Sequence, residues 1–259
     1  MMSTNDEKIL QLLESSDPKN IELAFQLCAG AVKHYGKEVA KVLQKYEMLC
    51  VKYGVEKDFY QNLEVLSIRC EDYTALPTAL SQFSNLTCLD MKENYLNEVS
   101  DVIGELGKLE TLSLHFNQIT KLSSQIRKLQ NLRTLYLRDN QLTHLPSEIG
   151  QLKNLEELFL NSNRLKRLPY QINGLSKLSV LILSYNLLTR IPPEIGQLQN
   201  LRTLHLAQNQ LQDLPVEIYR LKNLEILYLQ GNPIDDVKKL EIKDSMPNCE
   251  VVFQGGHPW

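Results

Sequence analysis

An asparagine recurs at a constant interval of 23 residues along most of this chain. Seven positions follow this interval without an insertion or deletion: Asn94, Asn117, Asn140, Asn163, Asn186, Asn209 and Asn232. One period before the first stands Glu71, in a segment whose apolar residues Leu63, Leu66 and Ile68 match those of the later units. The sequence therefore contains eight units, framed as residues 63–85 and then every 23 residues up to 246. A constant period of this size predicts a solenoid, because each unit buries its apolar side against its neighbours.

One unit, LRTLYLRDNQLTHLPSEIGQLKN at residues 132–154, shows the pattern most clearly. Leu135 and Leu137 alternate with polar or aromatic residues, which is the period of a strand with one buried face. The asparagine at the ninth position follows the strand, where its amide can bond backbone groups that no sheet ladder satisfies. Stacked units therefore predict an asparagine ladder. The LPxxI part is expected to return the chain as an extended or single-turn helical segment that begins at a proline. The units that carry this proline include those with Pro146, Pro169, Pro192 and Pro215.

This combination of leucines, asparagine and LPxxI resembles the leucine-rich repeat family over residues 63–246. It is most similar to the 23-residue class with an LPxxIxxLxN second half, found in bacterial proteins and in plant intracellular proteins related to Ras-binding repeats. The resemblance implies a right-handed α/β solenoid, or horseshoe, whose parallel sheet lines the concave side. It also implies a scaffold that binds another protein along that sheet without catalysis.

The residues before the repeats, 1–62, abandon the period and predict a helical N-terminal cap. Thr4 with Glu7 fits a capping box, and Asp17 followed by Pro18 fits the start of a second helix. Two glycines are placed to end helices: Gly30 and Gly54. We expect three helices that pack on the first strand and seal the apolar end of the solenoid.

The other end also departs from the repeat after Ile234. We expect a terminal helix within the last unit, followed over residues 247–259 by a cap strand and a tail. The apolar residues that would close the core there are Val251, Val252 and Phe253.

The composition of the chain limits which classes of partner and which cellular compartment are expected. The chain has a net charge of −3, which gives no overall attraction to nucleic acid or anionic lipid. No run of eighteen or more apolar residues predicts a membrane span, and no signal peptide is visible. Five cysteines at scattered positions suit a reducing compartment. We therefore expect a cytoplasmic protein of bacterial type that does not bind nucleic acid or insert into a membrane, with a monomer as the default state.

No catalytic, cofactor or metal site is predicted. The chain contains neither GxxxxGK[ST] nor GxGxxG. His115 and His205 should share the exposed strand face, but four repeats separate them by roughly 19 Å, so they cannot bind one metal ion. His34, His144 and His257 fall on a predicted helix, a turn and the tail, and are interpreted as scattered surface imidazoles. The sequence thus predicts a protein that is not an enzyme.

The residues that alternate with the core leucines should project from the concave side of the sheet. The fifth position of the eight units reads Ser67, Asp90, Ser113, Tyr136, Phe159, Ile182, His205 and Tyr228. The seventh reads Arg69, Lys92, His115, Arg138, Asn161, Ser184, Ala207 and Gln230. Phe116 and Tyr185, at the eighth position, add to this side. The predicted concave side is charged in its N-terminal half and aromatic or apolar in its C-terminal half.

Exposed contiguous aromatic surface usually marks an interaction site. We therefore predict that a partner protein contacts seven residues: Tyr136, Arg138, Phe159, Ile182, Tyr185, His205 and Tyr228. A competing explanation is that the fifth-position side chains form cross-strand pairs that only stiffen the sheet. Two other functions stay open: recognition of a glycan or cell-wall fragment by the aromatic residues, and a role as the repeat part of a GTPase-linked regulator. The basic seventh-position residues are interpreted as solvated mixed charges, with an acidic ligand as the alternative, and the convex Lys128, Arg167 and Arg220 as scattered charges.

Overall fold

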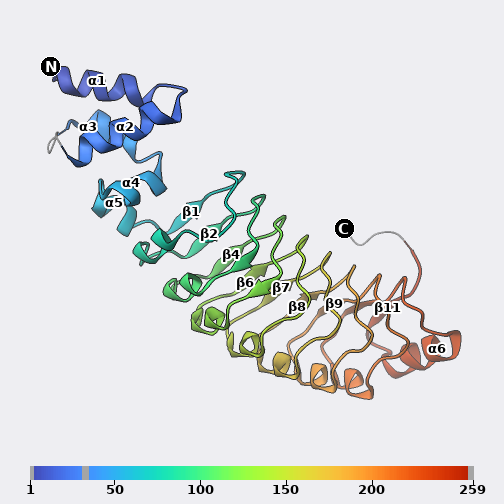
Figure 1. Cartoon of the computed structure of the whole chain (residues 1–259). Helices are drawn as coiled ribbons and strands as arrows, with labels where there is room; N and C mark the ends of the chain where they lie inside the picture. The colour runs from blue at the N-terminus through green and yellow to red at the C-terminus, as the bar shows by residue number, and fades with distance from the viewer. Residues whose placement is uncertain (1–2, 31–34, 256–259) are drawn as a thin grey trace.

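The computed structural model describes residues 3–30 and 35–255. Helices at the N-terminal end lead into a curved stack of similar coils that ends at one further helix and a last strand (Figure 1). Each coil corresponds to one 23-residue unit, with a strand on one side and a short helix on the other. The chain is therefore the right-handed α/β horseshoe that the repeat predicts.

The strands form one parallel sheet that runs the length of the stack. Its order in the described part of the chain is β1-β2-β4-β6-β7-β8-β9-β10-β11. Equivalent residues of successive units pair with one another, as Leu135 pairs with Leu158. These strands are β1 (Val65–Ser67), β2 (Cys88–Asp90), β4 (Thr111–Ser113), β6 (Thr134–Tyr136), β7 (Glu157–Phe159), β8 (Val180–Ile182), β9 (Thr203–His205), β10 (Ile226–Tyr228) and β11 (Glu250–Val252). A second parallel pair joins β3 (Glu98–Val99) to β5 (Lys121–Leu122).

A short 3-10 helix returns the chain in each of the first seven units, as the LPxxI pattern predicts. These helices are η1 (Thr78–Gln82), η2 (Asp101–Glu105), η3 (Ser124–Lys128), η4 (Ser147–Gln151), η5 (Tyr170–Gly174), η6 (Pro193–Gln197) and η7 (Val216–Arg220). The consensus proline precedes the helix and its carbonyl accepts the first hydrogen bond, as Pro146 accepts from the N–H of Ile149 at 3.1 Å. Gly150 lies where adjacent returns approach closely, since a Cβ there would overlap the carbonyl oxygen of Gln171.

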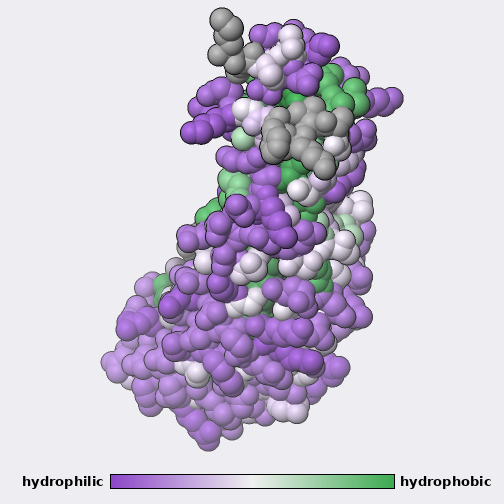
Figure 2. Space-filling model, turned by 90° about the vertical axis from the view of Figure 1, so that its left-hand side faces the viewer, coloured by the Kyte–Doolittle hydropathy of each residue, from purple (hydrophilic) through white to green (hydrophobic). Residues whose placement is uncertain are grey.

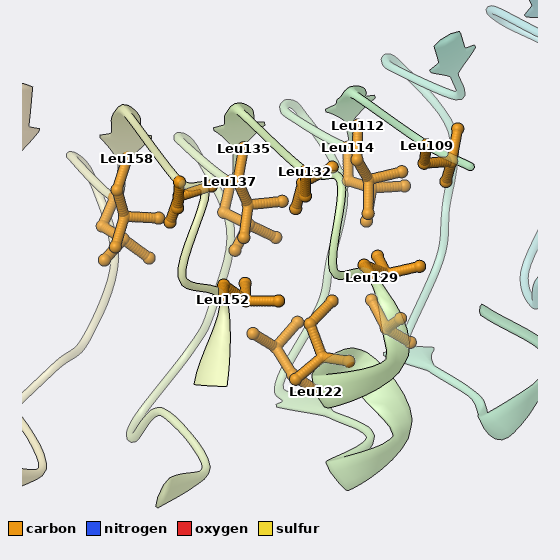
Figure 3. Packing of buried hydrophobic residues seen from close by; sticks show 14 of the residues in the cluster. Leu109, Leu112, Leu114, Leu122, Leu129, Leu132, Leu135, Leu137, Leu152 and Leu158 are labelled. Carbon is orange, nitrogen blue, oxygen red and sulfur yellow. The ribbon is translucent and has the colours of Figure 1, made fainter. Parts of the chain in front are cut away.

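The core is a continuous column of leucine and isoleucine side chains between the sheet and the return segments. In Figure 3, Leu112, Leu135 and Leu158 extend from successive strands toward Leu129 and Leu152 on the opposite side. All five are fully buried. Burial of apolar area between neighbouring units therefore supplies the main stabilisation of the stack.

The asparagine ladder is present. The side chain of Asn140 donates to the carbonyl oxygens of Leu137 in its own unit and Leu114 in the preceding one, at 3.1 and 3.0 Å. Its amide oxygen accepts from the N–H of Ile119 in the preceding unit at 2.9 Å. The other ladder members make equivalent bonds: Asn94, Asn117, Asn163, Asn186, Asn209 and Asn232. Each asparagine thus links two units through buried backbone groups.

The residue before each ladder asparagine adopts the left-handed backbone conformation. The last unit has glycine there, Gly231, with a φ of 73°. The other units place ordinary residues in this conformation, with φ between 53° and 57°: Cys70, Glu93, Phe116, Asp139, Ser162, Tyr185 and Gln208. The eighth position is therefore a turn after the strand and not a continuation of its alternating pattern, so Phe116 and Tyr185 project from the rim of the sheet.

Five helices occupy the described part of the N-terminal segment, and the expectation of three was wrong. They are α1 (Thr4–Leu13), α2 (Pro18–Ala29), α3 (Lys37–Leu43), α4 (Glu47–Tyr53) and α5 (Lys57–Gln61). The first begins one residue earlier than predicted, because Ser3 caps it by accepting from the N–H of Asp6 at 3.1 Å. Asp17 caps α2 as predicted, and Gly54 ends α4 with a φ of 66°. Figure 2 shows hydrophobic surface gathered over these helices, above repeats that present a mainly hydrophilic surface.

The last unit exchanges its 3-10 return for a regular helix, α6 (Asp236–Ser245), before β11 pairs with β10. Asp235 caps α6 by accepting from the N–H of Lys238 at 2.8 Å. The predicted terminal helix and last strand are therefore both present. Among the described residues, no helix combines the length and apolar character needed to cross a bilayer.

Candidate functional site

The side of the sheet turned away from the leucine core is called the concave face below. Its centre carries two stacked rings, Tyr136 at the end of β6 and Phe159 at the end of β7. Their ring centres lie 4.7 Å apart and the ring planes differ by 12°. The imidazole of His115 meets Tyr136 edge-on, with 6.0 Å between ring centres. The three rings form a continuous row, because Tyr136 and Phe159 are paired across neighbouring strands and His115, two residues beyond the Ser113 that pairs with Tyr136, lies diagonally to Tyr136.

A second ring pair lies further along the sheet, where His205 and Tyr228 have ring centres 4.1 Å apart. Ile182 lies between the two ring groups in the sheet order. The prediction that Ile182 and His205 are exposed is wrong, because their exposed fractions are only 1% and 3%. Parallel strands lie about 4.8 Å apart, so bulky fifth-position side chains cover their neighbours. Tyr136, Phe159 and Tyr228 keep partly exposed side chains.

A pocket of about 290 Å³ opens beside the stacked rings. The residues that line it are His115, Tyr136, Arg138, Phe159, Asn161 and Ile182. Four of these six were predicted contacts. Sequence reasoning did not assign His115 and Asn161 to the site, although both stand at the seventh position beside the predicted aromatic residues. The signal that could have found them is their diagonal placement relative to Tyr136 and Phe159 on adjacent strands.

Three of the predicted residues, Tyr185, His205 and Tyr228, are not among those that line this pocket. Tyr185 lies at the left-handed turn that follows β8 and is 40% exposed. Tyr228 lies near the C-terminal end of the sheet, beside His205. At the N-terminal edge of the pocket, the guanidinium of Arg138 lies 4.8 Å from the ring centre of Phe116, which is 43% exposed. The structure therefore groups three partly exposed predicted residues, Tyr136, Arg138 and Phe159, and separates Tyr185 and Tyr228 from them.

The basic residues at the seventh position each have a carboxylate nearby. Arg69 pairs with Asp90 at 2.7 Å, and Lys92 pairs with Glu93 at 3.3 Å. Arg138 lies 3.7 Å from the carboxylate of Asp139. These acids come from the fifth and eighth positions, so the charges on this half of the concave face largely compensate one another. This arrangement favours the interpretation of the column as solvated mixed charges over a site for an acidic ligand.

The two histidines of the concave face are held in their neutral form. Burial lowers the pKa of His205 to about 4. Burial also lowers the pKa of His115, and the nearby Arg138 guanidinium lowers it further. His115 therefore does not act as a cation at neutral pH, contrary to its inclusion in the basic column. Its Nδ1 lies 2.9 Å from the hydroxyl oxygen of Ser113, which fixes the imidazole in the wall of the pocket.

No cluster of three or more histidine, cysteine, aspartate or glutamate side chains suited to a metal ion occurs within residues 3–30 and 35–255. His144 is an exposed side chain whose Nδ1 lies 3.1 Å from the Thr143 hydroxyl. His34 and His257 lie outside the described residues. The chemistry that the concave face offers is therefore contact through partly exposed rings, one stacked guanidinium and two fixed neutral imidazoles.

Comparison with known proteins agrees with the repeat architecture. A family model described as leucine rich repeat matches residues 107–165, 130–188 and 176–234. Among solved structures, a leucine-rich repeat protein of Leptospira interrogans aligns with a TM-score of 0.71 and 39% identity, over 77% of this chain and 51% of that protein. TLR13 in its complex with ssRNA13 aligns with a TM-score of 0.61 and 30% identity, over 68% of this chain and 26% of that one. The chain thus spans about half of the first structure and a quarter of the second. No curated protein matches it.

Proposed function

The chain belongs to the leucine-rich repeat proteins, and from that premise we propose that it is a non-catalytic module that binds a partner protein on its concave face. Leucine-rich repeats are commonly protein–protein interaction modules, since stacked repeats create an extended surface from independent positions. The proposed contacts are Tyr136, Arg138, Phe159, Tyr185 and Tyr228, with buried Ile182 and His205 as the floor beneath them.

The observation that carries this proposal is the partly exposed ring pair beside the 290 Å³ pocket. Aromatic and arginine side chains dominate the energetics of many interfaces, and they do so where a pocket lets the partner desolvate them. Tyr136 and Phe159 are held in place by their stacking, so little side-chain entropy is lost when a partner orders them. Arg138 adds a guanidinium that Phe116 and Asp139 already orient.

Removal of Tyr136 and Phe159 should have different effects if the rings only stiffen the sheet and if they bind a partner. If Tyr136 and Phe159 only stiffen the sheet, their removal lowers stability by the stacking energy, about 0.5–1.5 kcal/mol, and changes nothing else. If they form an interaction site, their removal also weakens partner binding by about 2 kcal/mol or more, which is about thirtyfold in the dissociation constant.

The experiment compares proteins captured from lysates by the wild type and by a variant with Tyr136→Ala, Phe159→Ala and Tyr228→Ala, identified by mass spectrometry. A matched control replaces three exposed residues elsewhere: Tyr95, Val237 and Leu240, each by alanine. We expect a partner that the wild type and the control capture and the concave variant loses, with thermal unfolding confirming that all three are folded. Identical captures by all three proteins would contradict the proposal.

Two alternatives receive less support from the ring geometry and charge. A sugar stacks on open ring faces, whereas Tyr136 and Phe159 turn one face each toward the other. A polyanion needs uncompensated cations, whereas the cations of this face are paired. Because TLR13 forms a complex with ssRNA13, single-stranded RNA and a sugar panel are included in the binding tests. The hypothesis of a GTPase-linked regulator predicts that a GTPase is among the captured proteins.

We also propose that the protein functions in the reducing cytoplasm, as a monomer. The support for the reducing compartment is that all five cysteines are free thiols, and that burial raises the pKa of Cys28 to about 11 and of Cys50 to about 12. Such thiols are poor nucleophiles. A bacterial source is favoured by the resemblance to the Leptospira protein. Fractionation of the source cells and light scattering of the purified protein test location and oligomeric state.

A further inference from the structure

A second surface with different chemistry lies at the thirteenth position of the middle units. Three side chains of consecutive units share it, His144, Arg167 and Arg190, and all three are exposed. Lys166 stands beside Arg167 at the twelfth position. No ion pair among the described residues includes Lys166, Arg167 or Arg190. Arg167 is therefore part of an uncompensated basic cluster, and the interpretation of it as a scattered charge was wrong.

This cluster lies on the convex side of the solenoid. Leu122, at the fourteenth position of the third unit, lies across the core from the strands of the main sheet (Figure 3). The preceding Lys121 is exposed while Leu122 is buried, so thirteenth-position side chains point outward on this side. His144, Arg167 and Arg190 line the same two grooves, so these equivalent side chains of neighbouring units lie side by side.

The side chains of His144, Arg167 and Arg190 form a basic row, and a groove lies along each side of it. One groove has a volume of about 590 Å³ and is lined by the row itself and by an apolar bank that includes Leu168, Pro169, Tyr170 and Pro192. Tyr170 is 63% exposed, which is unusual for a ring of this size. The other groove, about 550 Å³, is lined by the same row with Lys166 and two threonines. We call the first one the convex groove.

Acidic residues occupy the thirteenth position beyond each end of the basic row. The thirteenth position carries Glu98 in the second unit and Asp213 in the seventh, and Asp213 pairs with Lys238 at 3.1 Å. Between these acids the thirteenth position carries a basic residue type in only four units, the third to the sixth. A ligand for this surface must carry negative charge over a short length and must also cover the adjacent apolar bank.

We propose that the convex groove binds a short acidic segment of a second protein, in extended conformation. Its carboxylates contact Arg167 and Arg190, and a large apolar side chain of the same segment covers Pro169 and Tyr170. One peptide segment then pairs with the two arginines and also covers the apolar side chains beside them. Single-stranded nucleic acid fits less well, because a strand of ordinary length would carry its phosphates past the acidic residues Glu98 and Asp213.

The test is a selection of random peptides for binding to the full chain, with counter-selection against a variant carrying Arg167→Glu and Arg190→Glu. A matched control carries the same charge change at two exposed cations outside the groove, Arg220→Glu and Lys222→Glu. A parallel selection uses a pool of random single-stranded RNA. A milder variant, Arg167→Gln with Arg190→Gln, is included in case the charge reversal prevents folding. Thermal unfolding shows whether each variant is folded.

We expect enriched peptides that are acidic and contain a large apolar residue. They should bind the Arg167→Glu, Arg190→Glu variant at least about tenfold more weakly than the wild type, and the control variant with unchanged affinity. Tyr170→Ala should also weaken them, and added salt should reduce their binding. The variant with Tyr136→Ala, Phe159→Ala and Tyr228→Ala should bind these peptides as tightly as the wild type does. Loss of peptide binding at the convex groove is therefore distinguishable from loss of partner binding at the concave face. Failure to enrich any peptide that depends on the two arginines, or enrichment of RNA that does, would overturn the proposal.

Discussion

Truncation of one ladder asparagine tests how the stack is held together. Asn163 is buried and accepts a hydrogen bond from the N–H of Leu142 in the preceding unit at 2.9 Å. Its amide nitrogen donates to the carbonyl oxygens of Leu137, Leu160 and Asn161 at 2.9, 3.1 and 3.4 Å. Asn163→Ala removes all four bonds at once and leaves the strands and the leucine core unchanged.

The cost depends on which backbone groups keep another partner. Each of the three carbonyl oxygens retains a second donor after the substitution, and those donors are Asn140, Asn186 and Asp139. The N–H of Leu142 has no other acceptor among the described residues. A buried N–H left without a partner costs about 1–3 kcal/mol, and the weakened carbonyls add about 1 kcal/mol in all. We therefore expect Asn163→Ala to lower the free energy of unfolding by about 3 kcal/mol.

The assay is urea unfolding followed by far-UV circular dichroism. Asn131→Ala is the matched control, because Asn131 is an exposed asparagine of another unit that donates one hydrogen bond, at 2.9 Å, to the carbonyl oxygen of Gly107. Its substitution should cost less than about 1 kcal/mol. Equal and small losses for the two variants would refute the argument, since the ladder would then contribute no more than a surface hydrogen bond.

Three further predictions follow from other parts of the structure. Gly150→Ala should lower the free energy of unfolding by about 2 kcal/mol, because its Cβ would overlap the carbonyl of Gln171. Gly107→Ala is the control and should change this free energy by less than about 0.5 kcal/mol, because its Cβ meets nothing nearer than 4.0 Å. Similar losses for the two variants in urea unfolding would contradict the packing argument. Because the pKa of His205 is lowered to about 4 in the folded state from about 6.5 when unfolded, stability should fall as pH decreases through that interval, and His205→Gln should flatten the dependence. A slope unchanged by that substitution would assign the pH dependence to other groups. Phe159→Ala should cost only about 1 kcal/mol of stability, since it removes a ring stack on a partly exposed surface; a loss above about 3 kcal/mol in the same assay would make the ring a core residue.

The architecture followed from the sequence because it depends on the period alone. A fixed spacing places every leucine and asparagine in the same environment in each unit, so the pattern at Leu135, Leu137 and Asn140 predicted the strand, the core and the ladder together. The N-terminal helices have no such repetition. Their number was underestimated there, because short helices such as α5 are set by tertiary packing more than by local pattern.

The concave face was predicted less completely. Alternation correctly indicates which side of the strand a residue occupies, but neighbours on adjacent strands decide whether it is exposed. Ile182 and His205 were expected at the surface and are buried, whereas Tyr136 and Phe159 remain partly exposed. The ion pair that compensates Arg69 joins it to Asp90 of the next unit, so it could be recognised only by comparing the fifth and seventh positions of adjacent units.

The convex groove shows the same dependence on several units. Arg167, considered within its own unit, is an ordinary exposed cation. Its significance comes from the equivalent His144 and Arg190 on either side and from the apolar bank that follows them, including Tyr170. A surface of this kind becomes visible when equivalent positions are compared across units for charge and for the absence of nearby acids.

Site-specific photo-crosslinking in lysates of cells that express the protein tests the central claim most directly. A photoreactive phenylalanine analogue replaces Phe159 on the concave face in one variant and Tyr95, an exposed ring outside it, in the other. We predict a discrete adduct with one partner protein from position 159 and none from position 95. The same adduct from both positions, or an adduct from position 95 alone, would contradict binding on the concave face.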